Sequence, residues 1–125
     1  MNKNVKVSAI VEKMNLKNLT PDVDYSEKVV EMPDINRPAL QLTGYFEHFD
    51  AERVQVIGYV EYTFLEKMAE EEKEKIYTML LSYKLPGIVF SRSQKPEAML
   101  LEKATAANIP IFQSEMKTSQ FTAEL

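Results

Sequence analysis

The loop of residues 91–95, Ser-Arg-Ser-Gln-Lys, carries the side chains that are best suited to hold an anion. It follows an apolar strand predicted at Ile88–Phe90 and precedes a helix predicted to open at Pro96. Open α/β sheets bind ligands at the carboxyl ends of their strands, and helix N-termini favour negative charge. The loop could therefore bind a phosphate or a carboxylate, or it could be a polar connection that only needs solubility. The candidate ligand-binding residues are Ser91, Arg92, Ser93 and Lys95.

His48 is the sole histidine, and the acidic residues Glu47 and Asp50 lie beside it. A histidine oriented by a carboxylate can act as a general base. The alternative is a partly exposed histidine in a turn that its aromatic neighbours anchor. We favour this second interpretation, because no nucleophile accompanies His48 in the local sequence.

The sequence lacks the common motifs for binding metals and nucleotides. Three aspartates (Asp22, Asp24 and Asp34) lack the ligand spacing, turn glycine and terminal glutamate of a calcium loop, so turns and caps explain them better. The three glycines lie too far apart for a phosphate-binding loop. With no cysteine, a disulfide framework, a thiolate nucleophile and a cysteine metal site are excluded. The glutamates from Glu70 to Glu74 indicate a solvated helix face.

Composition narrows the class of protein further. A chain of 125 residues fits one domain, and a net charge of -4 argues against a general nucleic-acid surface. The sequence contains no apolar run near the roughly 20 residues that span a bilayer, and its first residues lack a signal-peptide core. We therefore expect a cytoplasmic protein that binds neither nucleic acid nor membrane.

The elements that would position these residues are clearest between Leu85 and Phe112. This segment reads as a strand to Phe90, a loop, a helix over Pro96–Ala107 ended near Asn108, and a second strand. A strand–helix–strand unit of this length predicts parallel strands joined by a right-handed crossover. The fold class that follows is a single small α/β domain, with a mostly parallel sheet flanked by helices. The strand order stays open.

The rest of the chain gives shorter signals. Val7–Met14 predicts an amphipathic helix with Ser8 near its cap, although residues 5–7 could open as a strand. The further expected elements are a strand at Lys28–Met32, a helix from Pro38 capped by Asn36 and ended at Gly44, a strand at Arg53–Ile57, a helical face of Val60, Phe64 and Met68, and a helix over Glu70–Tyr83 with Ile76, Met79, Leu80 and Tyr83 buried.

Two residue sets follow from this pattern. The expected core comprises Val56, Phe64, Met79, Leu80, Val89, Phe90, Leu100 and Ile111. The expected partner-facing residues are Tyr45, Phe46 and Phe49. Near the end of the chain, Thr118-Ser119 offers a helix start with scarcely one further turn after it. Because helices this short are marginal alone, we expect the chain to be part of a longer protein.

Three segments resemble the amino-terminal domain of bacterial HPr kinase/phosphorylase. They are Val-Glu-Lys-Met-Asn-Leu at residues 11–16, Ile-Asn-Arg-Pro-Ala-Leu-Gln-Leu-Thr-Gly-Tyr-Phe at residues 35–46, and Arg-Val-Gln-Val-Ile-Gly at residues 53–58. The second segment is the most specific. Leu85–Phe112 fits the same domain, so the resemblance covers essentially the whole chain.

The resemblance implies a bifunctional enzyme of two domains. Its carboxy-terminal kinase domain uses ATP or pyrophosphate with magnesium to phosphorylate a serine of HPr, the carrier protein of the sugar phosphotransferase system. It also reverses the reaction by phosphorolysis, which controls carbon catabolite repression. The family enzyme is a homohexamer. Its amino-terminal domain is similar to the uridine-nucleotide-binding domain of the peptidoglycan-precursor (Mur) ligases.

On this resemblance, residues 1–117 form the amino-terminal domain and residues 118–125 begin the connection to the kinase domain. The family's phosphate loop and catalytic residues have no matching positions here, so we expect no catalytic, cofactor-binding or metal residues in this segment. The favoured hypothesis is a non-catalytic regulatory or assembly domain. One alternative is a stand-alone sensing module that binds a phosphorylated ligand at Ser91–Lys95, and another is a hydrolase that uses His48.

Overall fold

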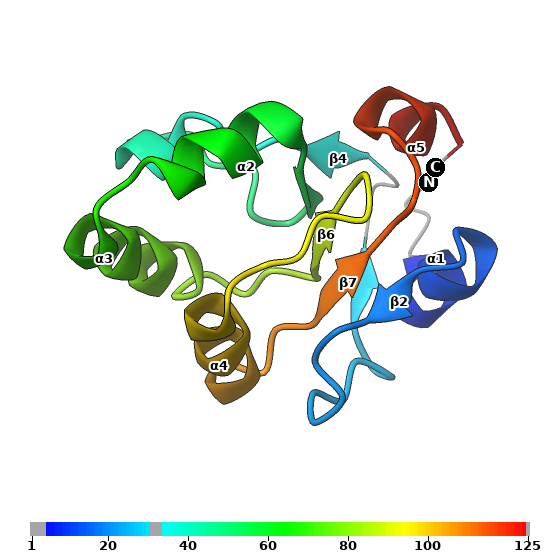
Figure 1. Cartoon of the computed structure of the whole chain (residues 1–125). Coiled ribbons are helices and arrows are strands. Elements are labelled where there is room, and N and C mark those ends of the chain that lie inside the picture. The colour runs from blue at the N-terminus through cyan, green and yellow to red at the C-terminus, as the bar shows by residue number, and fades with distance from the viewer. Residues whose placement is uncertain (1–4, 31–33, 125) are drawn as a thin grey trace.

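A five-stranded sheet, in the spatial order β2-β7-β6-β5-β4, forms the centre of the computed structural model, which describes residues 5–30 and 34–124 (Figure 1). Its strands are β2 (Lys17–Asn18), β4 (Ile35–Asn36), β5 (Val54–Ile57), β6 (Ile88–Phe90) and β7 (Ile111–Gln113). Strands β4 to β7 run parallel, whereas β2 is antiparallel to β7. A separate antiparallel pair joins β1 (Val5–Lys6) to β3 (Val29–Val30).

Helices cover both faces of this sheet. They are α1 (Val7–Lys13), the 3-10 helix η1 (Gln41–Thr43), α2 (Tyr59–Glu66), α3 (Glu70–Leu80), α4 (Ala98–Ala106) and α5 (Thr118–Glu124). Figure 1 shows α2, α3 and α4 on one side of the sheet and α1 and α5 on the other. The expected α/β class, with a mostly parallel sheet flanked by helices, is confirmed. None of the helices in the described ranges is long and apolar enough to cross a membrane.

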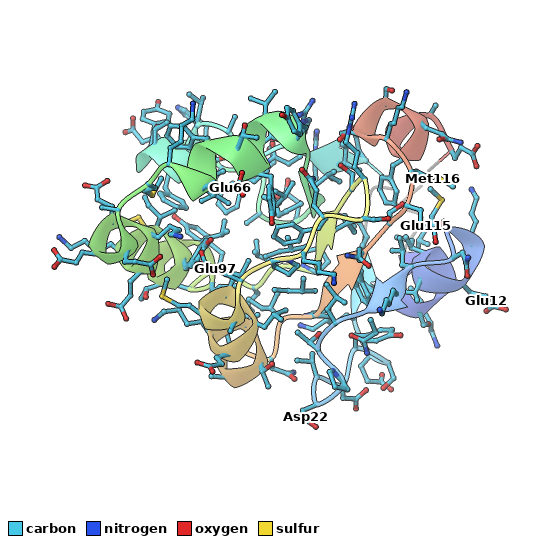
Figure 2. All side chains as sticks on the ribbon, viewed as in Figure 1. Glu12, Asp22, Glu66, Glu97, Glu115 and Met116 are labelled. Carbon is cyan, nitrogen blue, oxygen red and sulfur yellow. The ribbon has the colours of Figure 1, made fainter. Side chains whose placement is uncertain are left out.

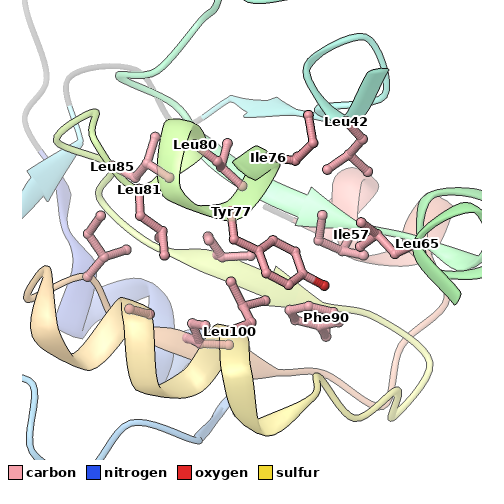
Figure 3. Packing of buried hydrophobic residues seen from close by; sticks show 14 residues of the cluster. Leu42, Ile57, Leu65, Ile76, Tyr77, Leu80, Leu81, Leu85, Phe90 and Leu100 are labelled. Atoms are coloured by element: carbon pink, nitrogen blue, oxygen red, sulfur yellow. The ribbon is translucent and has the colours of Figure 1, made fainter. Parts of the chain in front are cut away.

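The central strands β5 and β6 are apolar except for Gln55, because they are buried on both faces. Ile57, Ile88 and Phe90 pack toward α3 and α4 in one hydrophobic cluster (Figure 3). Their neighbours Val56 and Val89 point the opposite way, into a second cluster. The residues that α1 and α5 add to this second cluster include Val7, Ile10 and Phe121.

The strand–helix–strand unit predicted between Leu85 and Phe112 is confirmed as β6–α4–β7, with β6 and β7 parallel. Helix α4 begins two residues later than expected and ends with Ala107 as its C-cap. Asn108 follows in the left-handed region with φ 58°, a conformation that asparagine tolerates well. The N–H of Ile109 then donates to Ala104 O over 2.9 Å, which closes the helix end.

The predicted helix from Pro38 is wrong. Asn36 belongs to β4, and its side-chain amide donates to Gln55 Oε1 over 2.7 Å instead of capping a helix. The chain turns at residues 39–40 and forms only the 3-10 helix η1. The expected terminator is confirmed, since Gly44 ends η1 with φ 98°, where a side chain would be strained.

Two members of the expected core are exposed, namely Phe64 at 44% and Met79 at 46%, while the other six are buried. On α2 the buried residues are Glu61 and Leu65, one position further along than the predicted face. Helix α3 ends at Leu80 rather than at Tyr83. Lys73 and Tyr77 are buried on this helix, whereas Met79, which was expected to be buried, is exposed.

Smaller differences concern the amino-terminal half. Residues 5–6 form β1, and α1 starts at Val7 with Lys6, rather than Ser8, at the cap position. Of the strand expected at Lys28–Met32, Val29–Val30 forms β3, and residues 31–33 lie outside the described ranges. Tyr45 is 44% exposed, whereas Phe46 and Phe49 are half-buried against Tyr83.

Candidate functional site

The loop of residues 91–95 lies at the carboxyl end of β6, as predicted, but the backbone N–H groups of residues 91–94 already donate to carbonyls of the protein. Ser91 N donates to Ile57 O over 3.1 Å, and Arg92 N donates to Met116 O over 2.8 Å. Ser93 N and Gln94 N donate to the carbonyls of Ser114 and Ser91, over 2.8 and 3.1 Å. The loop therefore offers a ligand its side chains rather than a cradle of N–H groups.

Those side chains do not converge. Ser91 is fully buried, and its hydroxyl lies 2.7 Å from Thr118 Oγ1. Arg92 is exposed, with its guanidinium carbon 5.8 Å from the ring centre of Tyr59. Ser93 is exposed, and Lys95 lines a separate cleft. Because β4 to β7 follow one another in chain order, this part of the sheet also lacks the strand-order reversal at which open sheets form a ligand crevice.

An ion pair between a half-exposed arginine and a buried glutamate lies at the same edge of the sheet. Arg37, which follows β4, donates from Nε and Nη2 to Glu61 over 3.0–3.2 Å. The Glu61 side chain is 4% exposed, and its Oε1 also accepts a 2.7 Å hydrogen bond from Gly58 N at the start of α2. A Cβ on Gly58 would lie 2.6 Å from Thr118 Oγ1 and 2.7 Å from Arg37 Nη2. Glycine is required here by close approach, and the cluster connects β4, β5, α2 and α5.

A cleft of about 300 Å³ lies between α2, α3 and the start of α4. In Figure 2, Glu66 lies on the α2 side and Glu97 between α3 and α4. Lys73 Nζ donates to Glu97 Oε2 over 3.0 Å and also pairs with Glu70. The Tyr77 hydroxyl donates to Glu97 Oε1 over 2.6 Å. The cleft lining is Tyr62, Leu65, Glu66, Lys73, Tyr77, Phe90, Lys95, Pro96 and Glu97.

The surroundings of this cleft raise the pKa of two of its residues, Tyr77 and Lys73. Burial and then the hydrogen bond to Glu97 raise the pKa of Tyr77 above its usual range, so its hydroxyl remains a donor. Burial alone would lower the pKa of Lys73, but Glu70 and Glu97 together outweigh it and raise that pKa. Glu97 occupies the N-cap position of α4 without capping it, since its carboxylate binds α3 instead. The network can tie α4 to α3, and it places a carboxylate and an ammonium beside a polar cleft.

The sequence reasoning missed both clusters, although each left a signal. Glu61 follows Gly58 by three residues, which is the spacing of a capping box. Lys73 precedes Ile76 by three residues and Tyr77 by four, so it lies on the buried stripe of α3, where a lysine needs an acidic partner. The partner itself could not be read from the sequence, because Glu97 lies 24 residues away.

The other candidate residues lie apart from these clusters. His48 is exposed in a turn with φ 59°. Asp24 accepts a hydrogen bond from Ser26 N, which lowers its pKa, and Asp34 pairs with Arg53. Within the described residues, no group of three histidine, aspartate or glutamate side chains could hold a metal ion.

Comparison with known protein families shows which family this chain belongs to. Residues 5–125 match the model described as the HPr serine kinase N terminus. The chain belongs to the HPr serine kinase family. An HPr kinase/phosphorylase from Lachnoclostridium phytofermentans is 46% identical over 97% of this chain and 39% of the relative. One from Latilactobacillus sakei is 32% identical over 95% of this chain and 38% of the relative. The chain thus spans about two fifths of these family members.

Among solved structures, the fold is similar to a regulatory region of Clostridium perfringens pyrophosphatase that comprises CBS and DRTGG domains, solved with the activator diadenosine tetraphosphate. The TM-score is 0.64 at 12% identity, over 95% of this chain and 45% of that chain. At this identity the likeness concerns the fold alone. The expected similarity to the Mur ligases stays a prediction.

The family resemblance now has a structural explanation. Arg37 comes from the segment 35–46 and Gly58 from the segment 53–58, and the two meet at the carboxylate of Glu61. Two of the three segments that carry the resemblance to the HPr serine kinase family therefore meet where β4 and β5 end.

Proposed function

We propose that this chain is the non-catalytic amino-terminal domain of a bifunctional HPr kinase/phosphorylase, in which it serves regulation or assembly. In this proposal a carboxy-terminal kinase domain of the parent enzyme phosphorylates a serine of HPr with ATP or pyrophosphate and magnesium, and reverses the reaction by phosphorolysis. The parent acts in the cytoplasm as a homohexamer, and its reaction controls carbon catabolite repression.

One observation supports this proposal above all. A relative named HPr kinase/phosphorylase is 46% identical over nearly the whole chain, yet the matched part is only 39% of that relative. The rest of the relative offers ample length for a separate catalytic domain. The sequence of this chain also lacks a phosphate-binding loop motif.

The sensing alternative at Ser91–Lys95 receives less support. The N–H groups of residues 91–94 donate to protein carbonyls, and the candidate side chains do not converge on one point. Because Ser91 is buried, a phosphorylated ligand would have to be held by the exposed side chains of Arg92, Ser93 and Lys95. We therefore retain the domain of a kinase/phosphorylase as the proposed function.

The non-catalytic part of the proposal is tested by an HPr phosphorylation assay. The purified chain is incubated with HPr, magnesium and either ATP or pyrophosphate, and phosphoserine on HPr is measured by mass spectrometry. The intact Lachnoclostridium relative serves as the positive control. We expect phosphoserine with the relative and none with this chain. Phosphorylation by the chain itself, unaffected by removal of trace contaminants, would contradict the proposal.

A further inference from the structure

The polar cleft between α2, α3 and the start of α4 has the size of a small-molecule site. Its volume of about 300 Å³ lies at the lower end of the range of about 300–1,000 Å³ that ligand pockets occupy. The Tyr62 hydroxyl donates to Lys95 O over 2.7 Å, so α2 and the segment that leads into α4 are held together beside the cleft. Such a volume suits a ligand of amino-acid size better than a nucleotide.

Part of the cleft lining is apolar and aromatic. Leu65 and Phe90 are 5% and 1% exposed and belong to the hydrophobic cluster under the cleft. The ring of Tyr62 packs edge-on against Phe90, with 6.2 Å between the ring centres. Figure 3 shows Leu65, Tyr77 and Phe90 gathered at one end of that cluster. A ligand with an apolar side chain can be covered here.

A carboxylate and an ammonium group with spare hydrogen-bonding capacity lie in the cleft. Lys73 Nζ has three N–H groups, and Glu70 and Glu97 accept two of them over 3.0 Å. The Glu97 side chain is 33% exposed, and its oxygens accept one hydrogen bond each, from Tyr77 and Lys73, whereas a carboxylate can accept about four. Within the described residues, one donor of Lys73 and half of the acceptor sites of Glu97 therefore remain for a ligand.

A second carboxylate and a second ammonium group lie at the rim of the cleft. Glu66 ends α2 and Lys95 precedes α4, and both side chains are exposed, with no ion pair to another described residue. Exposed Lys67 and Glu70 lie outside the lining, which thus carries two negative and two positive charges. A ligand anion would meet both carboxylates, and a simple cation would meet both ammonium groups. A ligand that carries one charge of each sign matches the cleft best.

We propose that this cleft binds a zwitterionic α-amino acid with an apolar side chain. The carboxylate of the amino acid accepts from Lys73 and Lys95, and its ammonium group donates to Glu97 and Glu66. Its side chain lies against the aromatic part of the lining. This inference goes beyond the proposed function and does not depend on kinase activity.

Titration of the purified chain with L-phenylalanine and with L-leucine, followed by two-dimensional NMR, tests the cleft as an amino-acid site. We expect saturable shifts at the amides around the cleft, with a Kd below about 1 mM. Two analogues test the two ligand charges separately, since 3-phenylpropionate lacks the ammonium group and 2-phenylethylamine lacks the carboxylate. The Kd of each analogue should be about tenfold or more higher than that of L-phenylalanine, because charged groups of the cleft lose a hydrogen-bond partner.

The two exposed rim residues provide variants that leave the buried network intact. Glu66→Gln and Lys95→Gln should each raise the Kd for the amino acid about threefold to fivefold, as loss of one exposed charge pair does. Glu71→Gln and Lys67→Gln are the matched controls, because these exposed side chains do not line the cleft and the Kd should be unchanged. Thermal unfolding verifies that all four variants fold.

Several results would overturn the proposal. One is the absence of saturable shifts with both amino acids up to about 10 mM. Another is equal affinity for L-phenylalanine and either single-charge analogue. Tighter binding of inorganic phosphate or D-glucose in the cleft would show that an anion or a neutral polyol is the ligand instead. Equal effects of a rim variant and its control would mean that the amino acid binds elsewhere.

Discussion

At the scale of single residues, two carboxylates organise this domain. Glu61 accepts from Arg37 and from the N–H of Gly58, the N-cap residue of α2, and Glu97 accepts from Lys73 and Tyr77. In both cases a mostly buried group obtains a charged or hydroxyl partner from a distant part of the chain, which offsets the cost of desolvation. These contacts fix how α2 and α4 meet the rest of the protein.

Arg37→Ala should destabilise the domain by about 1–3 kcal/mol, because it leaves the buried carboxylate of Glu61 without its guanidinium. Arg53→Ala is the control, since Arg53 pairs with Asp34, whose side chain is 55% exposed, and such pairs contribute less than about 1 kcal/mol. Urea unfolding of the two variants measures both values. A loss for Arg37→Ala no larger than that for Arg53→Ala would show that the Arg37–Glu61 pair is not a stabilising contact.

Tyr77 should make the free energy of unfolding fall at alkaline pH. Burial raises its pKa in the folded state above the value of about 10 in the unfolded chain. Below that pH both states keep the proton. Above it the unfolded chain loses the proton first, so the unfolded state binds fewer protons and the free energy of unfolding decreases as pH rises.

The variant Tyr77→Phe should therefore be less stable than wild type at neutral pH, by about 0.5–1.5 kcal/mol for the lost hydrogen bond. Its free energy of unfolding should also decrease less steeply above pH 10 than that of the wild type, and urea unfolding across a pH series measures this slope. Tyr45→Phe is the control, since Tyr45 is 44% exposed and should leave the slope unchanged. Parallel pH curves for wild type and Tyr77→Phe would contradict the account.

At the scale of elements, α2 is oriented by its polar contacts as much as by its apolar ones. The spacing of Val60 and Phe64 indicates a helical face, but the face turned to the sheet carries Glu61 and Leu65. Glu61 must reach Gly58 N and Arg37, and this requirement rotates the apolar stripe toward solvent.

Adjacent residues on α2 test this orientation. Leu65→Ala should cost about 2–5 kcal/mol, because Leu65 is 5% exposed and packs in the core. Phe64→Ala should change stability by only about 0.5 kcal/mol in dilute solution, as exposed substitutions do. Chemical unfolding at low protein concentration gives both values. A larger loss for Phe64→Ala than for Leu65→Ala would mean that the helix is rotated the other way.

At the scale of the whole molecule, the sequence predicted what depends on local pattern. The apolar run Ile88–Phe90 and the helix after Pro96 identified β6–α4–β7 because burial on both faces requires such runs. The strand order, the orientation of α2 and the cleft network depend on pairs such as Lys73–Glu97, whose members are 24 residues apart. Local spacing carries no information about such pairs, so the sequence could name neither the cleft nor the Arg37–Glu61 pair.

The central claim is that this chain is the amino-terminal domain of an HPr kinase/phosphorylase. Its most direct test is a chimera in which the chain replaces the matching 39% of the Lachnoclostridium phytofermentans enzyme. Phosphorylation of HPr on serine by the purified chimera is the measurement. The account predicts an active chimera. A chimera that folds and yet fails to phosphorylate HPr, while the intact relative does so in the same assay, would contradict it.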